Sequence, residues 1–148
     1  MKILVDADAC PVKNLIEEIA ENYQLLVVLV CNSHHIINSN YSKVMIVDDK
    51  SQSADIAILN NTNKGDIVIT NDYGLAAVAL GKGAFTINFS GVQYDLKTID
   101  YLLMQRYVKQ KARQSGQKVS GPKKRSDKNN IKFKSKLIKL IEENVNIT

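Results

Sequence analysis

Short apolar runs alternate with helical patterns along the first 90 residues. Five mainly apolar runs have the length and composition of strands buried on both faces: 2–5, 25–30, 44–47, 67–70 and 84–87. Apolar residues recur at helical spacing over 12–23, and further helices are predicted over 53–61 and 73–80. Pro11 suits the first position of the first helix, and Ser53 suits the N-cap of the second. Strands that alternate with helices predict an α/β fold with a mostly parallel five-stranded sheet.

The last third of the chain has a different pattern. Residues 96–112 are predicted to form a longer helix whose buried stripe contains Leu96, Ile99, Leu103 and Tyr107. Residues 115–130 are rich in Lys and Arg, lack apolar periodicity and predict a basic loop. A final amphipathic helix is expected over 131–145, with Phe133 in the core. We therefore expect one domain over 1–148, in which an α/β core over 1–114 precedes this loop and helix.

The composition excludes several classes of protein. Hydrophobic residues make up 45% and charged residues 24% of the chain, which is typical of globular domains and not of disordered ones. The longest apolar run, over 25–31, is far shorter than the roughly 20 residues of a membrane-spanning helix. Asp6 and Asp8 interrupt the early apolar stretch, so we expect no signal peptide. Two cysteines cannot form a disulfide framework, and we predict a cytoplasmic protein.

The charge is distributed unevenly along the chain. Residues 1–100 contain 7 Lys/Arg and 12 Asp/Glu, whereas residues 101–148 contain 13 Lys/Arg and 3 Asp/Glu. A basic third that follows an acidic domain indicates a polyanionic partner, because Lys and Arg that neutralise phosphates release counterions. The alternative is a basic surface that only faces solvent. The charge therefore predicts a nucleic acid or another phosphate-rich partner, and no membrane partner is expected.

Six aspartates are expected near one edge of the sheet, and four of them form the candidate site. In a parallel α/β sheet, ligands bind beyond the carboxyl ends of the strands. Asp6 and Asp8 follow the first strand, and their spacing of two in an extended segment predicts that both side chains point the same way. Asp72 follows the fourth strand, and Asp55 lies in the first turn of the helix after the third strand. The carboxyl ends of different strands therefore bring these four side chains together.

Such carboxylates repel one another and raise each other's pKa unless a cation lies between them. Carboxylate oxygens suit Mg²⁺ or Mn²⁺, which can bind a phosphodiester and activate water. We therefore predict a metal site at Asp6, Asp8, Asp55 and Asp72, in which Asp6, Asp8 and Asp72 are catalytic. The alternative for Asp55 is a favourable interaction with the helix dipole that needs no metal.

Other acidic residues near the strands are less specific. Asp48 and Asp49 follow the third strand, where they could join the site or cap the next helix. Asp66 follows Gly65 and is predicted to be a turn residue outside the site.

Polar and basic residues supply further candidates. Substrate contacts are predicted for Asn32, Ser33, Thr70, Lys123, Lys124 and Arg125. Asn32, Ser33, Thr70 and Asn71 could equally be ordinary turn residues. A helix N-terminus next to Cys10 would lower the pKa of its thiol, but no base is near it in sequence. We favour structural burial for Cys10 and for Cys31. His34 and His35 are adjacent, lack partners at zinc-ligand spacing and are interpreted as loop residues.

Three strings of the sequence together resemble the bacterial YaiI/YqxD family, which is domain-of-unknown-function family 188. They are VDADACPV over 5–12, GDIVIT over 65–70 with Asp72, and Gly121-Pro122 before a Ser126-Asp127 helix start. This family is grouped with PIN-like and NYN-like domains, many of which are metal-dependent ribonucleases. The resemblance implies a three-layer PIN-like fold with strand order 3-2-1-4-5. It also implies that Asp6 and Asp8 match the acid at the end of the first PIN strand, Asp55 the mid-chain helix acid, and Asp72 the acid after the fourth strand.

Three hypotheses for the function follow. The first is a metal-dependent nuclease that hydrolyses RNA, with the basic segment 106–136 bound to the phosphate backbone. The second is a non-catalytic RNA-binding or ribosome-associated module of the same fold. The third is a phosphatase of the haloacid-dehalogenase type, because Asp6 and Asp8 form a D-x-D motif after a strand. Pro11 opens a helix soon after this motif and leaves little room for the flap of that superfamily.

Overall fold

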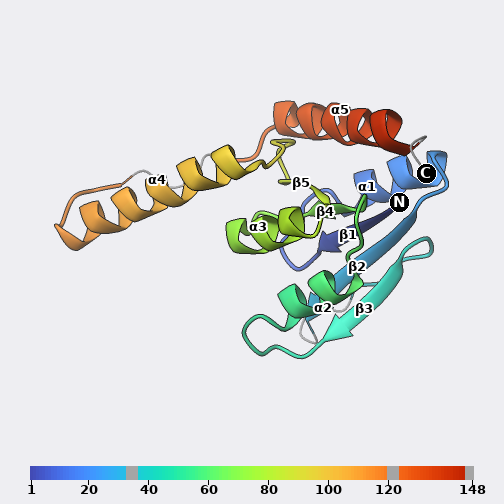
Figure 1. Ribbon diagram of the computed structural model, residues 1–148, viewed down its shortest axis with the longest axis horizontal. Helices are drawn as coiled ribbons and strands as arrows, with labels where there is room; N and C mark the ends of the chain where they lie inside the picture. Colours follow the sequence, from blue (N-terminus) through green and yellow to red (C-terminus); the bar gives the residue numbers. More distant parts are fainter. Residues whose placement is uncertain (33–36, 120–123, 146–148) are drawn as a thin grey trace.

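The computed structural model describes residues 1–32, 37–119 and 124–145, which form a three-layer α/β fold (Figure 1). The strands are β1 Lys2–Asp6, β2 Leu26–Asn32, β3 Lys43–Val47, β4 Ile67–Ile69 and β5 Phe85–Ile87. The helices are α1 Lys13–Asn22, α2 Ser53–Asn61, α3 Tyr73–Gly81, α4 Leu96–Gln114 and α5 Asp127–Asn144. All neighbouring strands are parallel, in the order β3-β2-β1-β4-β5. The predicted fold class and strand order are therefore confirmed.

Alternate residues of each central strand face opposite helical layers. Ile3 and Val5 of β1 belong to a core shared with α1 and α5, whereas Leu4 packs in a second core with α2 and α3. Figure 1 shows α1 and α5 on one side of the sheet and α2 and α3 on the other. Burial on both faces explains why these strands appear as continuous apolar runs in the sequence.

The C-terminal helix α5 is an integral part of the domain. Phe133 and Leu137 have no accessible surface and pack in the core shared with α1, as predicted for Phe133. The helix begins at Asp127, four residues before the start that apolar periodicity predicts. The Ser126 N–H donates to Asn129 Oδ1 at 2.9 Å, so a polar first turn is stabilised before the apolar stripe begins.

The helix α4 is mostly an arm that projects beyond the domain (Figure 1). Ile99 is buried against α3, as predicted, and Leu102 packs at the same contact. Leu96, Leu103 and Tyr107 are exposed, so the prediction of a buried stripe through them is wrong. The physical reason is length, because the nine-residue α3 supports only the first turns of the 19-residue α4. Neither α4 nor any other helix in the described ranges is long and apolar enough to cross a membrane.

Two predicted helix starts are also corrected. Pro11 lies in a turn before α1, which begins at Lys13 after the N-cap residue Val12. Ser53 is the first residue of α2 and not its N-cap, because Gln52 takes that position with a φ of 68°. The Ser53 hydroxyl instead bonds to the Asp48 carboxylate in the preceding loop.

Candidate functional site

A chain of hydrogen bonds links the carboxyl ends of β1 and β4. Asp6, the last residue of β1, accepts a hydrogen bond at Oδ2 from Thr70 Oγ1 at 3.0 Å. The same Thr70 oxygen accepts the Asp72 N–H at 3.0 Å, and the Thr70 carbonyl accepts the Tyr94 hydroxyl at 3.2 Å. Thr70 has no accessible surface. It therefore positions the Asp6 carboxylate, and the substrate contact expected of Thr70 stays a prediction.

Asp8 is held by a different neighbour of β1. The strand ends at Asp6, and the Cys10 N–H donates to the Ala7 carbonyl at 3.2 Å in the turn that follows. Both Asp8 carboxylate oxygens accept the Asn32 backbone N–H, each at 3.1 Å, at the end of β2. Asp6 is thus tied to the β4 side and Asp8 to the β2 side. The prediction that the two side chains point the same way is wrong, because the turn ends the extended segment between them.

Asp72 and Asp55 lie at the starts of two neighbouring helices and line the same cavity. Asp72 is the N-cap residue of α3, and its Oδ1 accepts the N–H groups of Gly74 at 2.9 Å and Leu75 at 3.1 Å. Asp55 lies in the first turn of α2. Both aspartates line a cavity of about 650 Å³ between these helices. Burial raises the pKa of the Asp55 carboxyl, and the negative charge of Asp72 raises it further.

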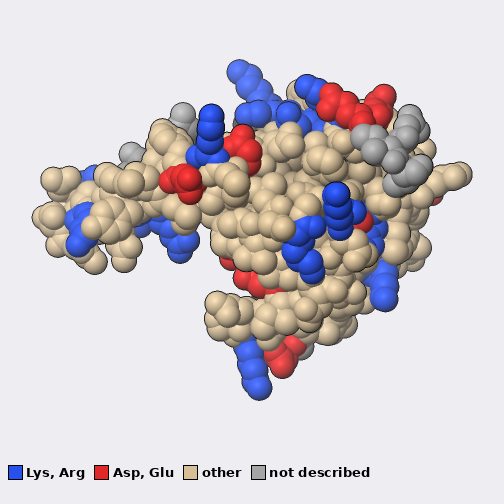
Figure 2. Space-filling model, viewed as in Figure 1, with Lys and Arg blue, Asp and Glu red and all other residues tan. Residues whose placement is uncertain are grey.

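The four predicted aspartates form one electrostatic group. Burial raises the pKa of the Asp6 carboxyl, the Thr70 hydrogen bond opposes this, and the charges of three further aspartates add to the increase: Asp55, Asp72 and Asp8. Figure 2 shows acidic side chains in the hollow between α3 and α2. The aspartates that the sequence predicts at this edge are therefore close enough to Asp6 for their charges to raise its pKa.

The donor chemistry of this group fits a hard divalent cation, although the side chains do not converge on one point. Within the residues that the structure describes, no group of three or more His, Cys, Asp or Glu side chains is arranged to hold a metal ion. Mg²⁺ in proteins commonly uses one or two carboxylates and completes its shell with water and substrate phosphate oxygens. A cation held by these carboxylates would therefore take the rest of its shell from water and phosphate oxygens.

The remaining acidic candidates lie outside this group. The Asp48 carboxylate accepts the Ser53 hydroxyl and the Lys50 N–H, which is the loop role that the sequence left open. Asp49 is an exposed residue of the same loop. Asp66 lies at the opposite edge of the sheet, where its Oδ2 is 2.6 Å from Lys2 Nζ. Asp66 therefore lies away from the aspartates that follow β1 and β4.

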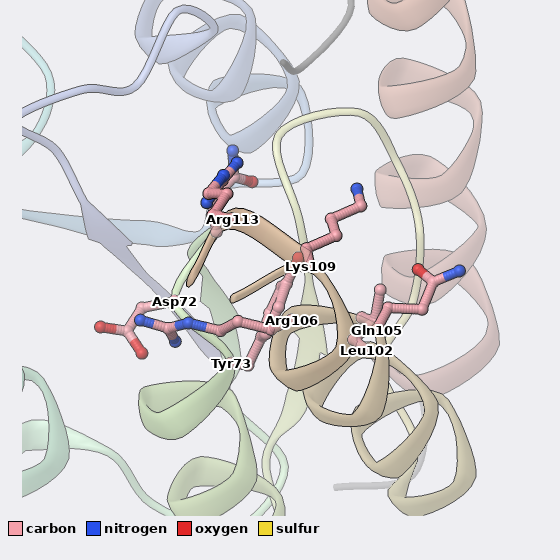
Figure 3. Close-up of a pocket in the computed structure, with 8 residues that line it drawn as sticks. Asp72, Tyr73, Leu102, Gln105, Arg106, Lys109 and Arg113 are labelled. Carbon is pink, nitrogen blue, oxygen red and sulfur yellow. The ribbon is translucent and has the colours of Figure 1, made fainter. Parts of the chain in front are cut away.

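A basic cleft adjoins the acidic group on its α4 side. A cavity of about 540 Å³ lies between the start of α3 and α4, and it is lined by Asn71, Asp72, Tyr73, Leu102, Gln105, Arg106, Lys109 and Arg113. Figure 3 shows that the Arg106 side chain extends toward the side of the cleft where Asp72 lies. Asp72 lines both this basic cleft and the acidic cavity. One side chain therefore joins a surface that suits a cation to a surface that suits a phosphate.

The cleft residues of α4 belong to the basic segment 106–136, but their charge alone does not separate them from the other lysines and arginines of that segment. Arg106, Lys109 and Arg113 are spaced by three and four residues, which places them on one face of a helix. That spacing is the signal that would have identified them. Their proximity to Asp72 could not be predicted, because it depends on how α4 crosses α3.

Two of the three basic residues predicted to contact substrate, Lys124 and Arg125, lie in the described part of the chain. Lys124 is exposed, and Arg125 donates from Nε and Nη2 to Asn130 Oδ1 at 2.9 and 2.7 Å. The Arg125 charge acts to lower the pKa of Cys10, so this guanidinium lies near the turn after β1. Six residues considered in the sequence analysis lie outside the described part of the chain: Ser33, His34, His35, Gly121, Pro122 and Lys123.

Both cysteines are buried, as predicted. Burial raises the pKa of the Cys10 thiol, which corrects the expectation that a helix N-terminus lowers it. The reason is that α1 begins only at Lys13, so Cys10 lies before the first turn of the helix. Burial also raises the pKa of Cys31. Neither thiol is activated as a nucleophile.

Comparison with known proteins places this chain in a family. The family model described as "Uncharacterized BCR, YaiI/YqxD family" matches residues 4–143. A UPF0178 protein of Clostridium novyi is 44% identical over 143 residues, which cover 97% of this chain and 96% of that protein. A UPF0178 protein of Clostridium tetani is 46% identical over 141 residues, covering 95% and 97% of the two chains. No solved structure matches the chain. The resemblance is therefore confirmed, and the chain belongs to the bacterial YaiI/YqxD family.

Proposed function

We propose that this protein is a metal-dependent nuclease that hydrolyses RNA phosphodiesters at the carboxyl edge of its sheet. The observation that carries the proposal is the double position of Asp72, which lines both the acidic cavity and the basic cleft. An RNA strand whose scissile phosphodiester contacts a cation at Asp72 would place its adjacent phosphates in the cleft lined by Arg106, Lys109 and Arg113. Neither the acidic cavity nor the basic cleft alone suggests cleavage. Because they meet at Asp72, an RNA backbone bound in the cleft would lie beside the proposed cation.

In this proposal some residues bind the cation and others position the residues that bind it. The cation, Mg²⁺ or Mn²⁺, would be held directly or through its bound waters by Asp6, Asp8, Asp55 and Asp72. The bound cation would supply charge stabilisation on the phosphate and activation of water. Thr70 fixes the Asp6 carboxylate through its 3.0 Å hydrogen bond. Such preorganisation lowers the cost of arranging the site when substrate binds.

The basic cleft would bind the backbone without reading its sequence. Arg and Lys contacts to phosphates position a nucleic acid but carry no base information. Tyr73 lines the cleft and packs edge-on against Tyr94, with ring centroids 6.2 Å apart. A single tyrosine supplies little base stacking, so we expect weak sequence preference and strong salt dependence. We place this activity in the cytoplasm, in agreement with two buried free cysteines.

The proposal predicts which variants lose cleavage of a labelled single-stranded RNA in Mn²⁺ or Mg²⁺. Asp8→Asn and Asp72→Asn should lose metal-dependent cleavage while RNA affinity is retained, because they remove carboxylate charges and leave the basic side chains of Arg106, Lys109 and Arg113 in place. Arg106→Ala should weaken RNA affinity and reduce the slope of its salt dependence by about one. Asp127→Asn and Lys43→Ala remove comparable exposed charges away from both surfaces and serve as matched controls.

Calorimetric titration with Mn²⁺ separates the metal site from the reaction. Saturable binding by the wild-type protein in the presence of an uncleavable RNA analogue, lost in Asp8→Asn and Asp72→Asn, would support the proposal. Cleavage that persists in both variants, or that is unaffected by EDTA, would refute it. Circular dichroism of each variant confirms that the fold is retained.

The second candidate is a non-catalytic RNA-binding module. It is favoured by the absence, within the described residues, of a three-carboxylate group and by the hydrogen bonds that already engage Asp6, Asp8 and Asp72. This alternative predicts RNA binding that is unaffected by EDTA and by the aspartate variants. The phosphatase hypothesis is not favoured, because the connection from β1 to α1 comprises only residues 7–12 and has no room for a flap.

A further inference from the structure

The arm formed by α4 presents an apolar face that no other element in the described part of the chain covers. After Leu102 the helix leaves α3, and four large apolar side chains follow on one face: Leu103, Met104, Tyr107 and Val108. Their exposed fractions are 44%, 62%, 56% and 57%. The spacing of three and four residues makes this a continuous stripe on the helix. Such a contiguous exposed patch on a helix is typical of an interaction surface.

Two opposite charges lie at the ends of this stripe. Asp100 precedes Leu103 by three residues, and Lys111 follows Tyr107 by four, so both lie on the same face of the helix. The Lys111 Nζ is 5.6 Å from the centroid of the Tyr107 ring, which shows that the lysine side chain lies along the stripe. The face is therefore acidic at one end, apolar in the middle and basic at the other end.

We propose that this face pairs with the same face of a second copy of the chain, as an antiparallel helix pair about a two-fold axis. When the axis passes between residues 105 and 106, Asp100 of each copy lies opposite Lys111 of the other. In the same register Leu103 lies opposite Val108, and Met104 lies opposite Tyr107. A two-fold axis repeats every contact, so one arrangement buries the apolar stripe and forms two ion pairs. A parallel pair in register would instead place Asp100 against Asp100.

The pairing is compatible with the basic cleft and does not depend on the proposed nuclease function. Arg106, Lys109 and Arg113 lie on the opposite face of α4 from the apolar stripe, so the cleft of each copy stays open. The stripe from Asp100 to Lys111 spans about 17 Å at the rise of an α-helix. An interface of this size is smaller than those of permanent dimers, so we expect a dissociation constant in the micromolar range.

Charge exchange tests both the partner and the register. Sedimentation velocity of the full chain between about 1 and 300 μM should show a reversible dimer, a range that brackets a micromolar constant. Asp100→Lys and Lys111→Asp each replace two attractive pairs by two repulsive ones and should weaken the dimer at least about tenfold. The double variant, with both changes, should restore an affinity close to that of the wild type. Lys109→Asp alters a neighbouring charge on the cleft face and should leave dimerisation unchanged.

The outcomes are decisive because all these residues are exposed and the variants should fold, which circular dichroism checks. A wild-type protein that stays monomeric at 300 μM would overturn the proposal, and the face would then belong to a different partner. A wild-type dimer that neither single variant weakens would show that copies associate elsewhere. A double variant as weak as the single ones would refute the antiparallel register.

Discussion

Asp72 has a structural and an electrostatic role that substitution can separate. Its Oδ1 caps α3 by accepting the Gly74 and Leu75 N–H groups, and its charge raises the pKa of Asp55. Asp72→Asn keeps an oxygen acceptor at the cap but removes the charge. Asp72→Ala removes both. The pair of variants therefore distinguishes a residue that only caps a helix from one that also belongs to a carboxylate group.

The expected stability changes follow from the cap. Asn and Asp are comparable N-cap residues, so Asp72→Asn should change the free energy of unfolding by less than about 0.5 kcal/mol. Asp72→Ala leaves two N–H groups without their acceptor and should cost about 1 kcal/mol, or about 2–4 °C in Tm for a domain of this size. Urea denaturation and thermal melts monitored by circular dichroism measure both values.

The electrostatic part is measured by NMR titration of the carboxyl groups. Both variants should lower the pKa of Asp55 relative to the wild type, because each removes a neighbouring negative charge. An Asp55 pKa that is unchanged in both variants would refute the acidic group. An Asp72→Asn protein as unstable as Asp72→Ala would refute the cap as the structural role.

Two further predictions concern stability. Burial raises the pKa of the Asp6 carboxyl above its ordinary value of 3.8, so the folded protein binds the carboxyl proton more tightly than the unfolded chain does. The folded protein therefore loses stability as pH rises from 3.8 through the raised pKa. In metal-free buffer, urea denaturation should find Asp6→Asn more stable than the wild type at pH 7, with a difference that shrinks as pH falls through the raised pKa toward 3.8 and levels off below it; a less stable variant at pH 7 would contradict this. Gly91 has a φ of 84°, and a Cβ there would lie 2.7 Å from backbone atoms of Lys132 and Phe133, so Gly91→Ala should cost about 2–4 kcal/mol in urea denaturation. Gly65 has a φ of 88° with nothing within 4 Å of its Cβ position, so Gly65→Ala should cost only the backbone strain, about 1 kcal/mol, and equal losses would refute the clash.

Local sequence predicted those parts of the fold that depend on burial along one element. The apolar runs marked all five strands, and they are most continuous in β1, β2 and β4, which contribute buried residues to the cores on both faces of the sheet. The core position of Phe133 followed from helical spacing. In contrast, the exposure of Leu103 and Tyr107 could not be predicted, because an apolar stripe on α4 looks the same whether α3 is long enough to cover it or not.

Some features of the candidate site are predictable from local sequence and others are not. The apolar runs predict that aspartates follow β1 and β4, and the parallel topology then brings Asp6, Asp55 and Asp72 to one edge. Only the tertiary structure decided that Asp8 turns to β2, because a single turn after Asp6 redirects the chain. Only the tertiary structure placed Arg106 beside Asp72, since the crossing of two helices is set by packing between residues far apart in the chain. Periodicity reports what an element buries, whereas a site depends on which elements meet.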